Sequence, residues 1–317
     1  MNWLIPEDAE LRWLLGGLLG LLLVASGVGA ALARRARGEK ARAVVENLNA
    51  RIRAWWVMVG FFSVAVLAGR GGAVVLFAGM SFMALREFIT LTPTHRADHR
   101  ALFWVFFVIT PAHYWLVWRE WYGLFSIFIP VYACLWLPMR NALAGETKDF
   151  LARTAKAQWA LMVCVYFLSH APALLTLPLP GGPREGAKLL FFLVVVVQMS
   201  DVLQYCWGKT LGRRPIVPKL SPSKTLEGFV GGVASASALG AGLWWLTPFT
   251  PGVAALMALA ICVMGFFGGL VMSAIKRDRG VKDFGAMIEG HGGMLDRIDS
   301  LCFAAPLFFH LTRYWYT

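Results

Sequence analysis

The stretch SAIKRDRGVKDFGAMIEGHGGMLDRIDS, residues 273–300, gathers lysines, arginines and acids between two apolar runs. These runs, near 252–275 and 300–315, approach the length of about 20 apolar residues that a helix needs to cross a bilayer. Charged side chains are costly inside hydrocarbon, and those within a membrane protein usually mark a functional position. The stretch therefore predicts a polar connection between two membrane helices, lying at the membrane surface.

The composition of the whole chain favours a membrane protein. Of its 317 residues, 58% are hydrophobic and 15% are charged, and the mean hydropathy is +0.61. Soluble domains carry roughly 25% charged residues. We expect an all-α integral membrane protein, a polytopic bundle of about 9–10 transmembrane helices. The candidate spans are residues 13–33, 54–69, 72–91, 101–118, 121–139, 157–178, 188–207, 228–247, 252–275 and 300–315.

The positive charges are distributed unevenly between the two sides of these spans. Most of the 30 lysines and arginines follow odd-numbered spans, which predicts that those loops face the cytoplasm. The net charge of +12 then reflects loops beside anionic headgroups, and we expect no nucleic-acid partner. Residues 34–53 are strongly basic. They fit either an interfacial helix that holds anionic lipid or an ordinary cytoplasmic loop.

The chain is predicted to form one continuous membrane domain with two parts. Residues 1–190 supply membrane helices and the basic segment 34–53. Residues 191–317 supply the helices that would carry the chemistry, with cytoplasmic loops at 208–226 and 276–299. The candidate functional residues fall in this second part, in three pieces.

The first piece is the end of the span near 188–207. An acid, Asp201, lies there among apolar residues, on the same helical face as Gln198 and Gln204. An acid at the edge of a span usually faces the bundle interior. Asp201 is therefore either a functional residue or one half of a hydrogen bond between helices.

The second piece is the loop 208–232, GKTLGRRPIVPKLSPSKTLEGFVGG. It is not a Walker nucleotide loop, because Leu203 stands where that motif needs a glycine. Hydroxyls and a cation precede a helix predicted to start near Glu227, and helix N-termini bind phosphate readily. Those residues are Ser221, Ser223, Lys224 and Thr225. The alternative is a capped helix start behind a basic loop.

The third piece is the opening stretch itself. Ser273, Lys276 and Arg277 share a helical face, and acids open the last helix around Arg297. The turn HGG at 291–293 lets backbone N–H groups approach a ligand closely. Carboxylates beside lysines and arginines suit a magnesium–nucleotide site, because acids hold the metal and cations meet the phosphates. A purely structural salt-bridged loop is the alternative.

The spacing of residues from Ser273 to Asp299 closely resembles the signature of the phosphatidate cytidylyltransferase (CDP-diacylglycerol synthase) family. LSPSKTLEGFVGG, residues 220–232, resembles that family's second motif, and Asp201 matches its upstream acid. The resemblance covers residues 190–315 firmly and looks like a divergent bacterial branch. Two positions depart from the pattern: Gly269 replaces a usual metal-binding aspartate, and Glu289 replaces a common proline.

The resemblance implies a reaction of CTP with phosphatidate that gives CDP-diacylglycerol and pyrophosphate. It implies Mg²⁺ bound by Asp296 and Asp201, CTP and membrane lipid as partners, and the inner membrane of a bacterial cell. A homodimer is compatible with it. The implied catalytic residues are Asp296, Asp201, Lys276, Arg277, Lys282 and Asp283. The implied substrate-binding residues are Ser221, Ser223, Lys224, Thr225, Glu227, Ser273, His291, Gly292, Gly293 and Arg297.

Two other functions stay open. Gly269 suggests a weakened relative that binds CTP or anionic lipid without efficient turnover, or that uses another lipid phosphate. A transporter fits less well, because its charges would lie at the bilayer midplane in broken helices. CDP-alcohol phosphotransferases are a closer comparison, but their DG…AR…G…D…D pattern is absent from the chain.

Overall fold

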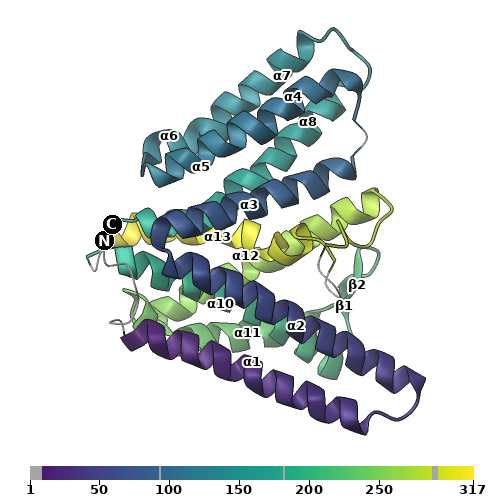
Figure 1. Ribbon diagram of the computed structural model, residues 1–317, viewed down its shortest axis with the longest axis vertical. Coiled ribbons are helices and arrows are strands. Elements are labelled where there is room, and N and C mark those ends of the chain that lie inside the picture. The colour runs from purple at the N-terminus through teal and green to yellow at the C-terminus, as the bar shows by residue number, and fades with distance from the viewer. Residues whose placement is uncertain (1–8, 93, 181–182, 288–291) are drawn as a thin grey trace.

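The computed structural model describes residues 9–92, 94–180, 183–287 and 292–317 as helices with one short hairpin (Figure 1). The helices are α1 (Ala9–Arg35), α2 (Glu39–Leu67), α3 (Gly69–Thr90), α4 (His99–Trp104), α5 (Thr110–Trp118), α6 (Tyr122–Ile127), α7 (Cys134–Ala142), α8 (Phe150–Leu161), α9 (Leu168–Ala173), α10 (Pro183–Leu211), α11 (Leu226–Gly242), α12 (Pro251–Asp278) and α13 (Leu295–Tyr316). The strands are β1 (Pro215–Val217) and β2 (Ser221–Thr225). Single π-helical turns join α4 to α5, α6 to α7 and α8 to α9.

Eight helical segments in the described part of the chain are long and apolar enough to cross a membrane. They correspond to α1, α2, α3, α4–α5, α6–α7, α8–α9, α10 and α12. Helix α11 is only 17 residues long, and α13 has acids and an arginine in its first turns. The two pack against α12 and complete the bundle. The predicted all-α polytopic membrane fold is confirmed.

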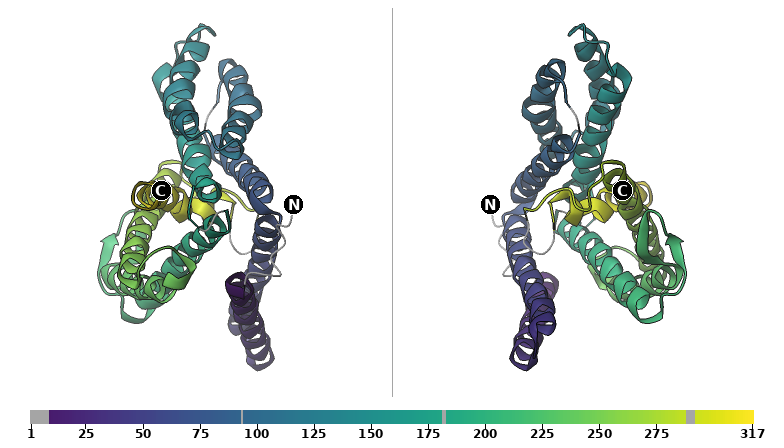
Figure 2. Two further views of the ribbon diagram at one scale, coloured as in Figure 1. Left: turned by 90° about the vertical axis from the view of Figure 1, so that its left-hand side faces the viewer. Right: turned by 90° about the vertical axis from the view of Figure 1, so that its right-hand side faces the viewer.

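The helices form three groups, seen from the side in Figure 2. Helices α1 and α2 make an arm, α4–α8 make a second group, and α10–α13 with the hairpin make the third. Helix α3 runs between these groups. The hairpin and the α12–α13 connection lie at the end of the molecule opposite the start of α1 and the end of α13 (Figure 1). The charged α12–α13 connection therefore lies at one end of the bundle.

The basic segment 34–53 is not a separate element between two spans, as its sequence suggested. Helix α1 continues to Arg35, and α2 begins at Glu39 after a turn at Gly38, whose φ is +85°. Residues 39–53 are thus the first half of one long helix, which continues through the predicted boundary at 54. The sequence GEKARAVVENLNARIR contains many good helix formers, so no break separates its polar and apolar halves.

The predicted loop 208–226 is also more ordered than expected. Helix α10 continues to Leu211, and the two strands form an antiparallel hairpin that pairs Val217 with Ser221. Helix α11 begins at Leu226, close to the predicted start near Glu227. Helices α10 and α11 cross closely: a Cβ at Gly232 would lie 2.4 Å from Gln204 Cγ. Glycine at this position therefore lets α11 pack directly against α10.

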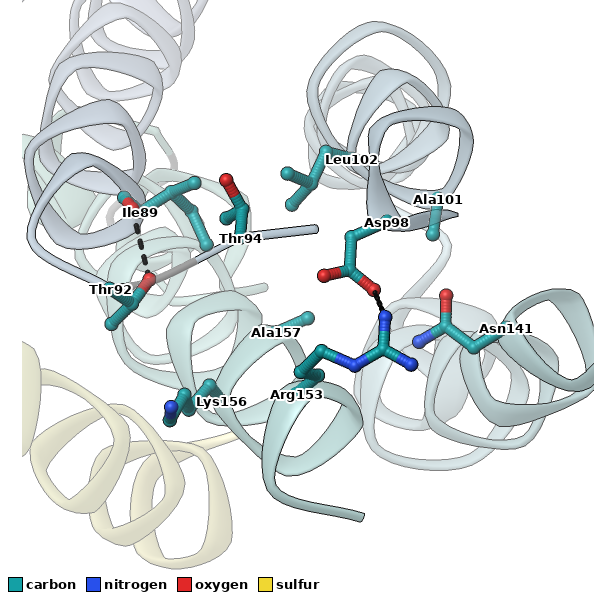
Figure 3. A pocket seen from close by; sticks show the side chains of 10 residues that line it. All are labelled: Ile89, Thr92, Thr94, Asp98, Ala101, Leu102, Asn141, Arg153, Lys156 and Ala157. Atoms are coloured by element: carbon teal, nitrogen blue, oxygen red, sulfur yellow. Dashed lines mark hydrogen bonds and ion pairs between the residues drawn. The ribbon is translucent and has the colours of Figure 1, made fainter. Parts of the chain in front are cut away.

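A buried ion pair joins helix α8 to the short turn Arg96–Asp98 that precedes α4 (Figure 3). Arg153 Nη1, from α8, donates to Asp98 Oδ1 at 2.7 Å, and both residues are buried. Asp98 also accepts from the backbone N–H of His95, which fixes the start of α4. These residues line a small pocket beside Lys156, away from the hairpin and outside the predicted site. The pair ties the turn before α4 to α8.

Candidate active site

The central ion pair of the predicted site joins α12 to α13. Lys276 Nζ donates to Asp296 Oδ1 at 2.8 Å, and both side chains are largely buried. The other oxygen, Oδ2, accepts from the backbone N–H groups of Phe284 at 2.8 Å and Gly293 at 3.0 Å. Lys276 also lies over the Phe284 ring, 5.5 Å from its centroid. Asp296 therefore organises the α12–α13 connection around its own carboxylate.

A second carboxylate reaches this connection from the first half of the chain. Glu87, near the end of α3, is buried and accepts from Met294 N and Leu295 N, each at 2.8 Å. These N–H groups lie at the start of α13, where a helix has no internal partners for its first donors. Negative charge is also favourable at a helix N-terminus. Glu87 thus fixes the position from which Asp296 extends.

The two described glycines of the predicted HGG turn fit between these carboxylates. Gly292 has φ +81°, and a Cβ there would lie 2.9 Å from Asp296 Oδ2. A Cβ at Gly293 would lie 2.4 Å from Glu87 Oε2. Both positions therefore require glycine, one for its backbone conformation and both for close approach. The Gly293 N–H, predicted to meet a phosphate, donates instead to Asp296. His291 lies outside the described residues.

Asp201 lies close to another acid, Asp299, and the two contact the same serine. Ser300 Oγ lies 3.2 Å from Asp201 Oδ1 and 3.4 Å from Asp299 Oδ1. Ser300 N also donates to Asp299 Oδ1 at 2.7 Å. Asp201 is exposed although it lies within a membrane-spanning helix. The structure therefore brings two carboxylates and a hydroxyl together where α10 meets α13.

Lys224 reaches the same place from strand β2. A Cβ at Gly269 would lie 2.6 Å from Lys224 Nζ, 3.7 Å from Ser300 Oγ and 3.8 Å from Asp299 Oδ2. The Lys224 ammonium contacts the Phe266 carbonyl oxygen at 3.5 Å and lies 4.9 Å from the Phe266 ring centroid. Burial lowers the pKa of Lys224, and the negative charges of Asp299 and Asp201 oppose that shift. Gly269 thus gives Lys224 room beside the carboxylates.

Arg297 lies in the first turn of α13, and the charges of Asp299 and Asp296 act on its guanidinium. Its side chain is half-buried, and its Nε atom is buried without a hydrogen-bond partner in the part of the chain that the structure describes. Gln198 Nε2 contacts its backbone oxygen at 3.5 Å, which ties α10 to α13 at this level. Together with Lys224 and Lys276, Arg297 gives the site its positive charge.

The hydroxyl-rich segment before α11 has mixed roles. Thr225 caps α11, because its Oγ1 accepts from Gly228 N at 3.1 Å. Ser221 and Ser223 lie on strand β2, half-buried and exposed respectively. Only Lys224, between Ser223 and Thr225, reaches the carboxylates at Gly269. The capping alternative is thus realised at Thr225, while the segment also contributes a cation to the site.

Some predicted residues do not join this group. Arg277 was expected on the same face as Lys276, but it is exposed and donates to the Leu220 and Val281 carbonyl oxygens. Adjacent side chains on a helix point about 100° apart. Because Lys276 points toward Asp296, Arg277 points away from it. Arg277 instead ties the hairpin turn to the end of α12. Lys282 and Asp283 are exposed on the connection that follows.

Two further predicted residues have local partners. Glu227 Oε2 accepts from Arg213 N at 2.9 Å and Arg214 N at 3.1 Å, which closes the base of the hairpin. These backbone hydrogen bonds, that of Arg213 first, lower the pKa of Glu227. Ser273 Oγ donates to the Gly269 carbonyl oxygen in its own helix at 2.6 Å. Neither side chain needs a substrate to satisfy its hydrogen bonding.

The donor set fits a magnesium ion that arrives with a nucleotide. Among the residues that the structure describes, no group of three or more His, Cys, Asp or Glu could hold a metal. Mg²⁺ is commonly bound by one or two carboxylates together with waters and substrate phosphates. Asp201 and Asp299 meet that description beside the Ser300 hydroxyl. Asp296 fits less directly, because its two oxygens already accept three hydrogen bonds.

Comparison with known proteins decides which family carries this arrangement. The model of the cytidylyltransferase family matches residues 49–315, which include every described residue of the site. The chain belongs to the cytidylyltransferase family. It is therefore a nucleotidyltransferase, and the transporter alternative is not supported.

Named relatives refine this placement. The cytidylyltransferase is 43% identical over 271 residues to the uncharacterized protein YnbB of Escherichia coli (strain K12), covering 84% of this chain and 88% of that protein. It is 30% identical over 277 residues to the phosphatidate cytidylyltransferase of Bacillus subtilis (strain 168), covering 86% and 97%. It is 37% identical over 163 residues to that of Mycobacterium leprae (strain TN), covering 51% of each chain.

Sequence patterns did not predict the part that Glu87 plays in this cytidylyltransferase, and they assigned no role to Asp299 or Ser300. The signal for Glu87 was an acid beside Arg86 inside an apolar run, which is rare enough to mark a functional or structural partner. Asp299 was within the quoted stretch, and its position one turn from Asp296 places the two on one side of α13. Nothing in the sequence pairs Glu87 with α13, because 208 residues separate it from Leu295.

Proposed function

We propose that this chain is a phosphatidate cytidylyltransferase that converts CTP and phosphatidate into CDP-diacylglycerol and pyrophosphate. The observation that carries the proposal is the convergence of Lys224 with Asp201 and Asp299 at the end of the bundle, close to the Lys276–Asp296 pair. Two relatives that bear this enzyme name support the choice of reaction.

The reaction does not depend on a strong general base. The phosphomonoester of phosphatidate is already largely ionised at neutral pH, since its second pKa is about 6. One of its oxygens attacks the α-phosphorus of CTP, and the bond to the pyrophosphate breaks with its electron pair leaving on pyrophosphate. Charge neutralisation and alignment then provide most of the catalysis.

The cations of the site have different roles in charge neutralisation, according to where each one lies. Among the residues that the structure describes, the Lys224 ammonium contacts one carbonyl oxygen and one ring, so it has further hydrogen-bonding capacity for a ligand. We assign it and Arg297 to the phosphates of CTP. Lys276 is engaged by Asp296 and supports the connection. Bound Mg²⁺, held by Asp201 and Asp299, would neutralise the triphosphate; the predicted role of Asp296 as a ligand stays a prediction.

We further propose that the site faces the cytoplasm at the inner membrane of a bacterium. The basic turn between α1 and α2 lies at the same end as the hairpin, and positive loops favour the cytoplasmic side (Figure 1). CTP would then arrive from solution and phosphatidate laterally from the leaflet. The homodimer also stays a prediction, which cross-linking in membranes would test.

The decisive experiment supplies purified protein with phosphatidate, magnesium and CTP labelled at its α-phosphate. Label should move into the lipid phase, and inorganic pyrophosphate should appear in equal amount. Asp299→Asn should remove this activity, whereas Asp278→Asn, an exposed acid beside Arg279, should keep it. No transfer to phosphatidate by correctly folded protein would defeat the proposal.

A second candidate function is favoured by Gly269. Where the resemblance expects an acid, the structure has the Lys224 ammonium. The chain could then bind CTP or a lipid phosphate with little turnover, or accept a different lipid phosphate. The same assay with other lipid phosphomonoesters, and CTP binding by calorimetry, separates these outcomes.

A further inference from the structure

The Lys224 ammonium occupies the space that a side chain at position 269 would fill. A Cβ on Gly269 would lie 2.6 Å from Nζ, closer than real Cβ contacts allow. The neighbouring atoms are polar: Ser300 Oγ lies 3.7 Å and Asp299 Oδ2 3.8 Å from that same Cβ position. Glycine at 269 is therefore the condition for a lysine to extend this far toward the carboxylates.

The Lys224 ammonium is charged but forms few hydrogen bonds. Its only polar contact among the described residues is the Phe266 carbonyl oxygen, at 3.5 Å. It forms no ion pair with a described carboxylate, although Asp299 and Asp201 act on its charge. The Phe266 ring face supports a cation from one side, 4.9 Å from the centroid. Lys224 thus lies near the two acids without being locked to either.

The two acids would otherwise be a concentration of negative charge. Asp201 and Asp299 share the Ser300 hydroxyl, so their carboxylates lie close to each other. Two carboxylates that both contact one hydroxyl repel each other, and a nearby cation reduces this repulsion. A lysine and a divalent metal ion provide the same relief and therefore compete for the same carboxylates.

We infer that Lys224, in the space left by Gly269, is a built-in counter-cation of Asp201 and Asp299 that weakens their binding of a divalent metal until a phosphate draws the ammonium away. The inference deepens the proposed function, on which it rests for the identity of that phosphate. It makes metal binding depend on the nucleotide. A metal ion would occupy the carboxylates mainly in company with CTP, because the nucleotide both supplies ligands and engages Lys224.

The test measures Mn²⁺ binding by electron paramagnetic resonance, in a non-ionic detergent and without CTP or lipid. Lys224→Met, which keeps the length but removes the charge, should bind Mn²⁺ about tenfold more tightly than the parent. Lys224→Arg keeps the charge and should bind as weakly as the parent. Lys219→Met is the matched control, because Lys219 is an exposed lysine in the turn of the same hairpin.

A second pair of variants tests whether the change in Mn²⁺ affinity arises at the carboxylates. Adding Asp299→Asn to Lys224→Met should abolish the gain in Mn²⁺ affinity, while adding Asp278→Asn should not. If Lys224→Met does not fold, Lys224→Gln takes its place in the same comparison. Equal Mn²⁺ affinity in the parent and the uncharged variants, including no detectable binding in any of them, would overturn the inference. Because CTP is absent, this result is independent of whether the parent transfers cytidylyl groups.

Discussion

Glu87 accepts a hydrogen bond from the backbone N–H of Leu295, 208 residues further along the chain, at 2.8 Å. Its other oxygen accepts from Met294 N at the same distance. One side chain of α3 thus satisfies the exposed start of α13, the helix that carries Asp296 and Asp299. The first half of the chain therefore contributes to the position of the site as well as to membrane anchoring.

Replacing Glu87 should damage both stability and activity. Glu87→Ala leaves two backbone donors without a partner, each costing about 1–3 kcal/mol. We expect a lower thermal unfolding temperature and a fall in kcat. Glu87→Gln keeps one acceptor oxygen and should retain an intermediate kcat with a nearly unchanged KM for CTP. Glu46→Ala, an exposed glutamate on α2, is the control. Normal kcat in Glu87→Ala would show that α13 is positioned without it.

Asp296→Asn should abolish activity while the protein stays inserted and folded. The amide offers one acceptor oxygen where the carboxylate offers two, so Lys276 or the backbone of the connection loses its partner. Hydrogen exchange at Phe284 N and Gly293 N should accelerate in the same variant, which a loss of metal binding alone would not cause. Turnover at the parent rate would remove Asp296 from the site.

Lys224→Ala should weaken the use of CTP. A charge-assisted hydrogen bond to phosphate contributes about 1.5–3 kcal/mol, which corresponds to about a ten- to hundredfold fall in kcat/KM. Lys219→Ala removes a positive charge from the same hairpin and should leave the value near that of the parent. Unchanged CTP kinetics in Lys224→Ala would mean that strand β2 is only structural.

Gly269→Asp should lower the magnesium concentration needed for half-maximal activity. The new side chain would meet the Lys224 ammonium, and its carboxylate would add a third acid near Asp299. Pairing with the lysine and binding of the metal both favour this result. The measurement is CDP-lipid formation against magnesium concentration in both proteins. A fully active parent that Gly269→Asp does not improve would exclude the weakened-relative function.

The fold class could be predicted from the sequence because hydrophobic length is a local property. Each apolar run shows by itself whether it can cross a membrane, so the predicted spans match most of the helices found. The positions at which the helices begin and end were less predictable. Polar and apolar segments can share one helix when both contain good helix formers, as in α2, and a loop of prolines and hydroxyls can pair as a hairpin, as at 215–225.

The sequence by itself determined the family: the types and spacing of the residues in 273–300 and 220–232 indicate a cytidylyltransferase. Only the tertiary structure decided which of those residues meet. It directed Lys276 to Asp296 and Arg277 to the hairpin turn, brought Glu87 to the start of α13, and placed Lys224 over Gly269. The physical reason is that a side chain's partner is set by how helices distant in sequence cross and by what space a glycine leaves, neither of which local spacing contains.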